Sequence, residues 1–159
     1  MTTTDLTLDC FPTGAPHLNH VAMSVSPEVL SVAGRTSLTG FYDSVFGWTE
    51  VESMTLDEKR LILSTNRIDQ FIFLIADEQP MVAPRMDHFG IMVGSLDELV
   101  AVYERACRYR ELDDRVDAIA PSFEDHDVVK IHSTYVGYLL PMMVEVQHWE
   151  FQTPENGEG

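Results

Sequence analysis

Two histidines occupy the same place in two similar stretches of the sequence, and they are the first residues that indicate a chemical function. Residues 18–25 read LNHVAMSV and residues 86–93 read MDHFGIMV, so His20 and His88 each stand third. In both stretches apolar residues recur at every second position, which is typical of a strand with one buried face. This alternation places both imidazoles on the opposite face. We therefore expect both histidines to point toward the same kind of surface, where they could bind a ligand.

The same alternation selects one carboxylate near the end of the chain. Val144 and Val146 flank Glu145, so the glutamate lies on the face opposite the two valines. A carboxylate buried there without a partner is unfavourable by several kcal/mol, and a divalent cation would compensate for that cost. Together with the two histidines, Glu145 makes a set of two nitrogen ligands and one oxygen ligand. This set favours Fe(II) or Mn(II) with open coordination positions, and Zn(II) or Ni(II) remain alternatives.

The elements that must position these residues follow the same order in each half of the chain. In the first half, Leu38, Phe41, Tyr42 and Val45 recur at helical spacing, and Gly47 is suited to ending the helix. Three strands are then predicted, at residues 48–53, 60–65 and 70–76.

In the second half, Ser95 and Glu98 have the spacing of a capping box at the start of a helix. An apolar stripe indicates the buried side of that helix. Its members are Leu96, Leu99, Val100, Tyr103, Ala106 and Cys107. Three more strands are predicted, at about residues 115–120, 128–135 and 142–149.

The repeated order predicts a single α+β domain made of two tandem strand-helix-strand-strand-strand (βαβββ) modules. We expect them to form a curved mixed sheet around a shared cavity. The first module spans residues 18–76 and the second spans residues 86–150, with a linker at 77–85. An N-terminal arm at 1–17 and a disordered tail at 151–159 complete the 159 residues.

Composition narrows the function classes further. The formal net charge of −16 repels phosphate backbones and anionic lipids, so nucleic acid and membrane partners are not expected. The longest apolar runs are far shorter than the roughly 20 residues that cross a bilayer. The first residues lack the pattern of a secretory signal. Cys10 and Cys107 have no zinc or redox spacing, which favours a cytoplasmic location.

With a histidine in the first strand of each module and a glutamate in the last strand, the sequence resembles the vicinal oxygen chelate superfamily. This group includes glyoxalases, bleomycin resistance proteins and extradiol dioxygenases. The resemblance covers residues 18–149 and implies that His20, His88 and Glu145 bind a divalent metal ion that chelates neighbouring oxygens of a small substrate.

Glyoxalase I-like members of this superfamily carry a fourth ligand in the last strand of the first module. Here the centre of that strand offers only phenylalanine and aliphatic side chains. The substitutes are Gln70 at its start and Asp77 or Glu78 just past its end. The three-ligand pattern of extradiol dioxygenases therefore fits better.

His126 and Tyr135 precede Glu145 at spacings similar to those of a histidine and a tyrosine in extradiol dioxygenases. The resemblance implies that Tyr135 hydrogen-bonds a substrate oxygen and that His126 acts as an acid or base near dioxygen. Residues 138–141 read YLLP, where the family commonly has an Asp-Pro-x-Gly turn.

Three other histidines are not expected to bind metal. His17 precedes His20 by three residues, but a strand does not bring that pair onto one face. His132 and His148 differ in strand parity from Tyr135 and Glu145, so we interpret them as structural.

The sequence therefore predicts a cytoplasmic metal-dependent oxidoreductase, a ring-cleaving dioxygenase acting on a catechol-like substrate, and a homodimer. The alternatives are a glyoxalase-like lyase, isomerase or epimerase, and a metal-free protein that binds a small molecule such as an antibiotic.

Overall fold

The computed structural model describes residues 16–67 and 69–152. Most of the predicted arm, with Cys10, and most of the predicted tail lie outside the described residues. The first module contains β1 (His20–Val25), α1 (Pro27–Leu30), α2 (Val32–Phe46), β2 (Thr49–Glu50), a short 3-10 helix (Glu52–Met54), β3 (Arg60–Arg67) and β4 (Gln70–Ala76). The second module contains β5 (His88–Met92), α3 (Leu96–Arg110), β6 (Asp117–Asp125), β7 (Val129–Gly137) and β8 (Met143–Phe151).

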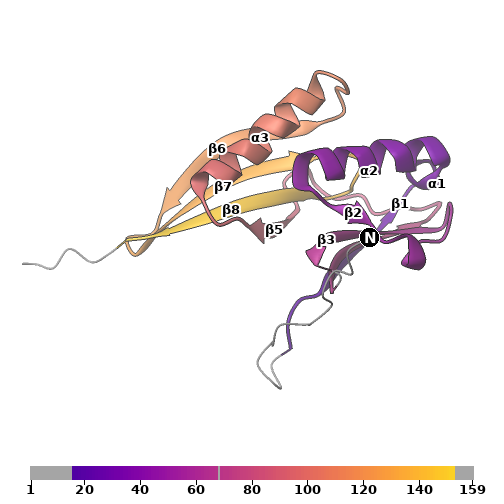
Figure 1. Ribbon diagram of the computed structural model, residues 1–159, viewed down its shortest axis with the longest axis horizontal. Helices are drawn as coiled ribbons and strands as arrows, with labels where there is room; N and C mark the ends of the chain where they lie inside the picture. Colours follow the sequence, from indigo (N-terminus) through magenta and orange to yellow (C-terminus); the bar gives the residue numbers. More distant parts are fainter. Residues whose placement is uncertain (1–15, 68, 153–159) are drawn as a thin grey trace, which may run out of the picture.

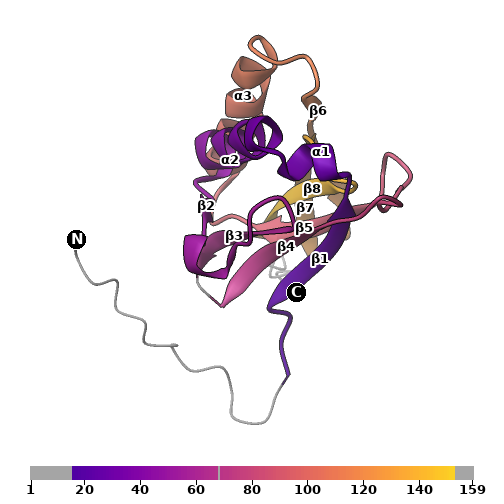
Figure 2. The same ribbon diagram turned by 90° about the vertical axis from the view of Figure 1, so that its right-hand side faces the viewer.

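Each module builds one four-stranded mixed sheet with the same topology. The strand orders are β1-β4-β3-β2 and β5-β8-β7-β6. The first strand pairs parallel with the last strand of its module, and the other pairs are antiparallel. This arrangement confirms the predicted α+β fold of two βαβββ modules. Figures 1 and 2 show α2 and α3 along the same side of the molecule, with the two sheets beneath them.

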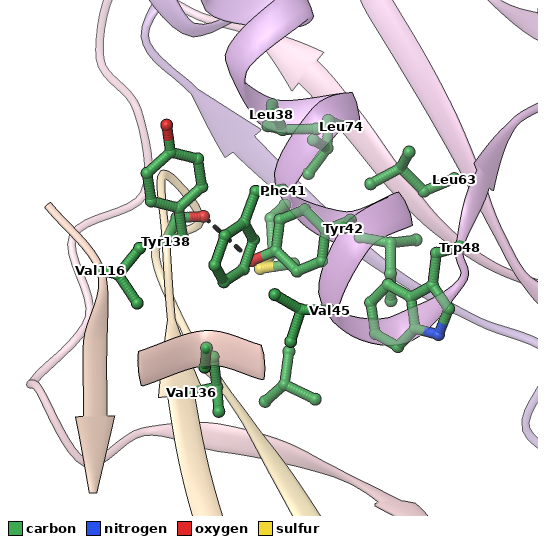
Figure 3. Close-up of a cluster of buried hydrophobic side chains, with 14 of the residues drawn as sticks. Leu38, Phe41, Tyr42, Val45, Trp48, Leu63, Leu74, Val116, Val136 and Tyr138 are labelled. Atoms are coloured by element: carbon green, nitrogen blue, oxygen red, sulfur yellow. Dashed lines mark hydrogen bonds between the residues drawn. The ribbon is translucent and has the colours of Figure 1, made fainter. Parts of the chain in front are cut away.

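The core lies where the helices meet the sheets and each other. Leu38, Phe41, Tyr42 and Val45 are all fully buried, as their spacing predicts, and Gly47 ends α2 in the left-handed conformation. The Tyr42 hydroxyl donates a hydrogen bond of 2.9 Å to the backbone carbonyl of Tyr138 in the second module (Figure 3). The two modules therefore share one core.

A second group of contacts joins the same two helices. The ring of Phe41 on α2 packs against Tyr109 on α3, with a centroid separation of 5.0 Å. The Arg105 Nε donates a hydrogen bond of 2.8 Å to the carbonyl of Val45. The helices thus join the modules on one side of the sheets, and the opposite face of each sheet is left open.

Two predictions about local structure were wrong in detail. The strand expected at 48–53 is only Thr49–Glu50, because a turn begins at Val51. The Val51 carbonyl accepts a hydrogen bond of 3.0 Å from the Met54 amide. The stripe predicted on α3 is also rotated. Its buried residues are Leu99, Val102 and Ala106, whereas Leu96 is exposed. The predicted capping box of Ser95 and Glu98 is confirmed.

No helix in the described part of the chain is long and apolar enough to span a membrane.

Candidate metal centre

His88 lies at the start of β5, an edge strand of the second sheet, and its ring orientation is fixed by one hydrogen bond. Its Nδ1 is 2.7 Å from the backbone carbonyl oxygen of Met86. A carbonyl can only accept, so Nδ1 carries the proton and donates. The neutral ring then has its lone pair on Nε2. This is the arrangement in which a histidine binds metal through one nitrogen while the other is held by the protein.

Glu145 lies on β8, in register with Gly90 of β5 on one side and Tyr135 of β7 on the other. It is only 7% exposed. Its Oε2 is 3.3 Å from His88 Nε2, and its Oε1 accepts a hydrogen bond of 2.7 Å from the Tyr135 hydroxyl. His88 and Glu145 thus lie on one face of one sheet, as their parity predicts, and Tyr135, which the family resemblance indicated, lies on the same face.

The surroundings of Glu145 keep it ionised. Burial raises its pKa, but hydrogen bonds from Tyr135, Gln147 and Ser133 and the nearby His88 lower it by more, so the pKa lies below its ordinary value. The converse holds for the tyrosine. Burial and the hydrogen bond to Glu145 raise the pKa of Tyr135 to about 12, so its hydroxyl keeps its proton at neutral pH.

The contact between His88 and Glu145 indicates which kind of ligand this site can hold. An ionised carboxylate is an acceptor only, and Nε2 of the neutral ring that donates through Nδ1 is also an acceptor. Two acceptors that face each other at 3.3 Å are stable when a cation lies between them, either a proton on the ring or a metal ion. The donor set therefore fits a divalent metal ion.

His20 lies on β1 at the open face of the first sheet, as its parity predicts. Its ring stacks on Phe71 of β4 with a centroid separation of 5.0 Å, and its Nδ1 is 2.8 Å from Asn19 Oδ1. His20 does not join His88 and Glu145. Among the residues that the structure describes, no group of three or more histidine, cysteine, aspartate or glutamate side chains is placed to hold a metal ion.

The candidates for a fourth ligand stay apart from His88 and Glu145. The face of β4 that carries the His20 neighbour presents Phe71, Phe73 and Ile75 by strand parity. Asp77 follows the end of β4, where its carboxylate accepts a hydrogen bond of 2.8 Å from the Gln79 amide. Gln70 lines a cavity of about 670 Å³ between the modules, which His20 also lines, and Glu78 is exposed beyond β4.

His126 lies in the tight turn between β6 and β7, where its Nε2 is 3.3 Å from Glu124 Oε2. The following strand starts in register with Phe151, six residues beyond Glu145. At a rise of about 3.4 Å per residue, the turn is roughly 20 Å from Glu145 along the sheet. Within one chain the structure brings Tyr135 to the site and leaves His126 outside it.

The two remaining histidines of the second sheet lie on its helix-side face, opposite Glu145, as expected. His132 Nε2 is 3.0 Å from Glu150 Oε2, and the His132 ring stacks on His148 with centroids 6.1 Å apart. The residues that sequence reasoning did not assign to the site are Ser133, Gln147 and Gly90. Their parity with Glu145 on paired strands could have indicated all three.

The fold has counterparts among solved structures. No family model and no curated protein sequence matches the chain. Fosfomycin resistance protein FosX from Mesorhizobium loti is similar with a TM-score of 0.57 at 16% identity, over 84% of this chain and 92% of that one. A glyoxalase/bleomycin resistance protein from Albidiferax ferrireducens T118 gives 0.55 at 16% identity, over 82% and 98%. Lactoylglutathione lyase from Agrobacterium tumefaciens gives 0.53 at 16% identity, over 85% and 95%.

These likenesses, together with the two βαβββ modules, establish the fold class. The chain has the same paired-module fold as these proteins, and the fold that the sequence resemblance implied is confirmed.

Proposed function

We propose that this protein is a divalent-metal-dependent enzyme whose substrate binds the metal ion through two neighbouring oxygens. The observation that carries the proposal is the contact between His88 Nε2 and Glu145 Oε2, two metal-ligand atoms that face each other at 3.3 Å. When bound, the ion would act as a Lewis acid toward the substrate oxygens. Fe(II) or Mn(II) is favoured by the nitrogen and oxygen donors, with Zn(II) or Ni(II) as alternatives.

The chain's own residues have separate roles in this proposal. His88 and Glu145 hold the ion, and the Met86 carbonyl keeps His88 in the tautomer that binds metal. The Tyr135 hydroxyl holds the carboxylate through Oε1 and leaves Oε2 free for the ion. With its pKa raised to about 12, Tyr135 is a hydrogen-bond donor at neutral pH.

The third ligand, His20, comes in this proposal from a second copy of the chain. His20 lies on the open face of the first sheet and His88 lies on the open face of the second, while the helix side is used in joining the modules. A homodimer in which the first sheet of each copy faces the second sheet of the other would complete two equivalent sites. Such a paired contact is the usual form of a two-fold symmetric dimer.

Mixing two defective variants tests this arrangement. His20→Ala and Glu145→Gln should each bind little metal alone, as measured by elemental analysis after loading with Mn(II). Unfolded and refolded together, they should recover about a quarter of the wild-type sites, since half of the dimers are mixed and each mixed dimer has one intact site. Recovery of none would refute the sharing of ligands between copies. The control variant His132→Ala, on the opposite face of the sheet, should keep full metal content.

A reaction that consumes no dioxygen, such as the isomerisation, epimerisation or lyase chemistry of glyoxalase-like enzymes, is favoured by the position of His126. That residue was expected to act beside dioxygen, and it lies roughly 20 Å along the sheet from Glu145 in the same chain. Ring-cleaving dioxygenation of a catechol-like substrate is the second candidate, favoured by Tyr135 beside the proposed ligands.

An oxygen electrode separates the two reaction classes. Protein loaded anaerobically with Fe(II) and then supplied with a panel of catechols in air should take up no oxygen above the background of free iron. Uptake that disappears in Tyr135→Phe would move the proposal to the dioxygenase. Protein that binds none of the four metals would refute an enzyme of this type and favour the metal-free binding protein.

A further inference from the structure

A small pocket of about 300 Å³ lies on the open face of the first sheet. It is lined by His20 of β1, by Phe71 and Phe73 of β4, by Arg60 and Ile62 of β3, and by Ser53 and Met54 of the 3-10 helix. The floor is therefore aromatic and aliphatic, and a single cationic side chain lies at one end. His20 lies at the other end, because it is in register with Phe71 whereas Arg60 is in register with Ile75.

Within the described part of the chain, Arg60 differs from most of the arginines in having no carboxylate partner. Its Nε donates a hydrogen bond of 2.9 Å to the Met54 carbonyl, and among residues 16–67 and 69–152 no acidic group lies within 4.0 Å of its guanidinium. By contrast, Arg35, Arg85 and Arg115 each pair with a carboxylate at 3.0 Å or less.

This difference is informative because the protein has 26 acidic residues and only 10 lysines and arginines. With such an excess of carboxylates, an unpaired guanidinium that lines an apolar pocket points to a ligand that brings its own negative charge. The bond from Nε to the Met54 carbonyl fixes the plane of the guanidinium and leaves its two terminal nitrogens for a bidentate contact with an oxyanion.

We infer that this pocket binds a small anionic molecule with an aromatic or apolar body, whose carboxylate or phosphonate contacts Arg60 while its body packs on Phe71 and Phe73. The stacked pair of His20 and Phe71 places the far end of this ligand beside the proposed metal ligand. The rows of Arg60 and His20 are four residues apart along β4, about 13 Å, and the long arginine stem reduces that span. Assigning this anion to the substrate rests on the proposed function; the anion site itself does not.

Fluorine NMR on the full-length, metal-free protein tests the inference. The probes are fluorobenzoate, fluorobenzenephosphonate and the neutral fluorobenzyl alcohol. We expect at least one anionic probe to bind about tenfold more tightly than the alcohol, because hydrogen bonds to a charged group are the stronger ones. The anion that binds more tightly identifies the planar or the tetrahedral head group.

Arg60→Met should weaken the anionic probe by about tenfold and leave the alcohol unchanged. Lys59→Met is the matched control, since it removes the same charge from the neighbouring residue, which does not line the pocket. Equal affinity for anion and alcohol, or equal loss in the two variants, would overturn the inference.

Metal content measured on the same samples separates this inference from the proposed function. Protein that binds Mn(II) but no anionic probe would refute the anion site and leave the metal centre standing. Protein that binds the anionic probe through Arg60 but no metal would support the anion site and refute the metal centre.

Discussion

Replacing Tyr135 by phenylalanine tests how the structure keeps Glu145 ionised in a nearly buried position. The substitution removes one hydroxyl and with it the 2.7 Å hydrogen bond to Glu145 Oε1. A hydrogen bond to a charged group contributes about 1.5–3 kcal/mol to stability. Ser133 and Gln147 still donate to the carboxylate, so we expect Tyr135→Phe to lower the free energy of unfolding by about 1–2 kcal/mol at pH 7.

The pH dependence gives this prediction its sign. The pKa of Glu145 in the folded protein lies below its ordinary value of 4.5, so its ionisation stabilises the fold above pH 4.5. That contribution is lost as the pH falls through the lower folded-state value. Removing the tyrosine donor moves the folded-state pKa upward. The difference in stability between wild type and Tyr135→Phe should therefore be largest near neutral pH. It should narrow in acid, where Glu145 is protonated in both proteins.

Urea unfolding of the metal-free protein at several pH values measures this difference. Protein concentration must be constant, because dimerisation shifts apparent stability. Tyr103→Phe is the control, since that hydroxyl interacts with Cys107 on its own helix and not with a carboxylate of the site. A difference for Tyr135→Phe that is within about 0.5 kcal/mol of zero at pH 7, or that does not change with pH, would refute the reasoning.

Substitutions at three further positions test the site and the core. Gly90→Ala should keep Mn(II) binding, because a Cβ there makes only an ordinary contact of 3.6 Å with Glu145 Oε2. Gly90→Val should abolish it, because the larger side chain fills the space of the ion. Elemental analysis measures the Mn(II) content of both variants. Tyr42→Phe should cost about 1 kcal/mol in urea unfolding, since it removes one buried hydrogen bond to the Tyr138 carbonyl, which still accepts from the Leu140 amide. Gly34→Ala should cost about 3 kcal/mol or more in the same assay, because its Cβ would lie 2.2 Å from a backbone carbonyl oxygen of α1.

The faces of the strands could be predicted from the sequence because alternation is a local property. His88 and Glu145 were assigned to the open face from their nearest neighbours alone, and the ladder places both on one sheet, where Tyr135, named from the family resemblance, joins them. The order of elements in the modules could be predicted as well, because the local patterns of the first half recur in the second. His126 is different. It was assigned from its spacing in the sequence, which does not fix a distance in space. Each strand residue between the turn and the site adds about 3.4 Å to their separation.

The way the modules meet could not be predicted from the same pattern. The helical spacing of Phe41 and Tyr42 indicates an apolar stripe, but a stripe does not specify what it packs against. In the structure both residues contact Tyr138 of the second module, so part of the stripe joins the modules. Aromatic residues on the strands and their flanks also differ in what they contact. Tyr138 and Trp48 are buried in the core, whereas Phe71 lines the pocket beside His20.

The same packing explains why one chain has half of each proposed site. Each sheet is covered by helices on one face, and joining two such modules through their helices directs both open faces away from the contact. His20 and Arg60 then lie on one open face, and His88 and Glu145 lie on the other. If the proposed dimer forms, each metal centre combines the anion-binding face of one copy with the carboxylate face of the other. Metal affinity should then fall on dilution below the dimer dissociation constant, whereas the affinity for the anionic probe should not change, because the pocket with Arg60 lies within one chain.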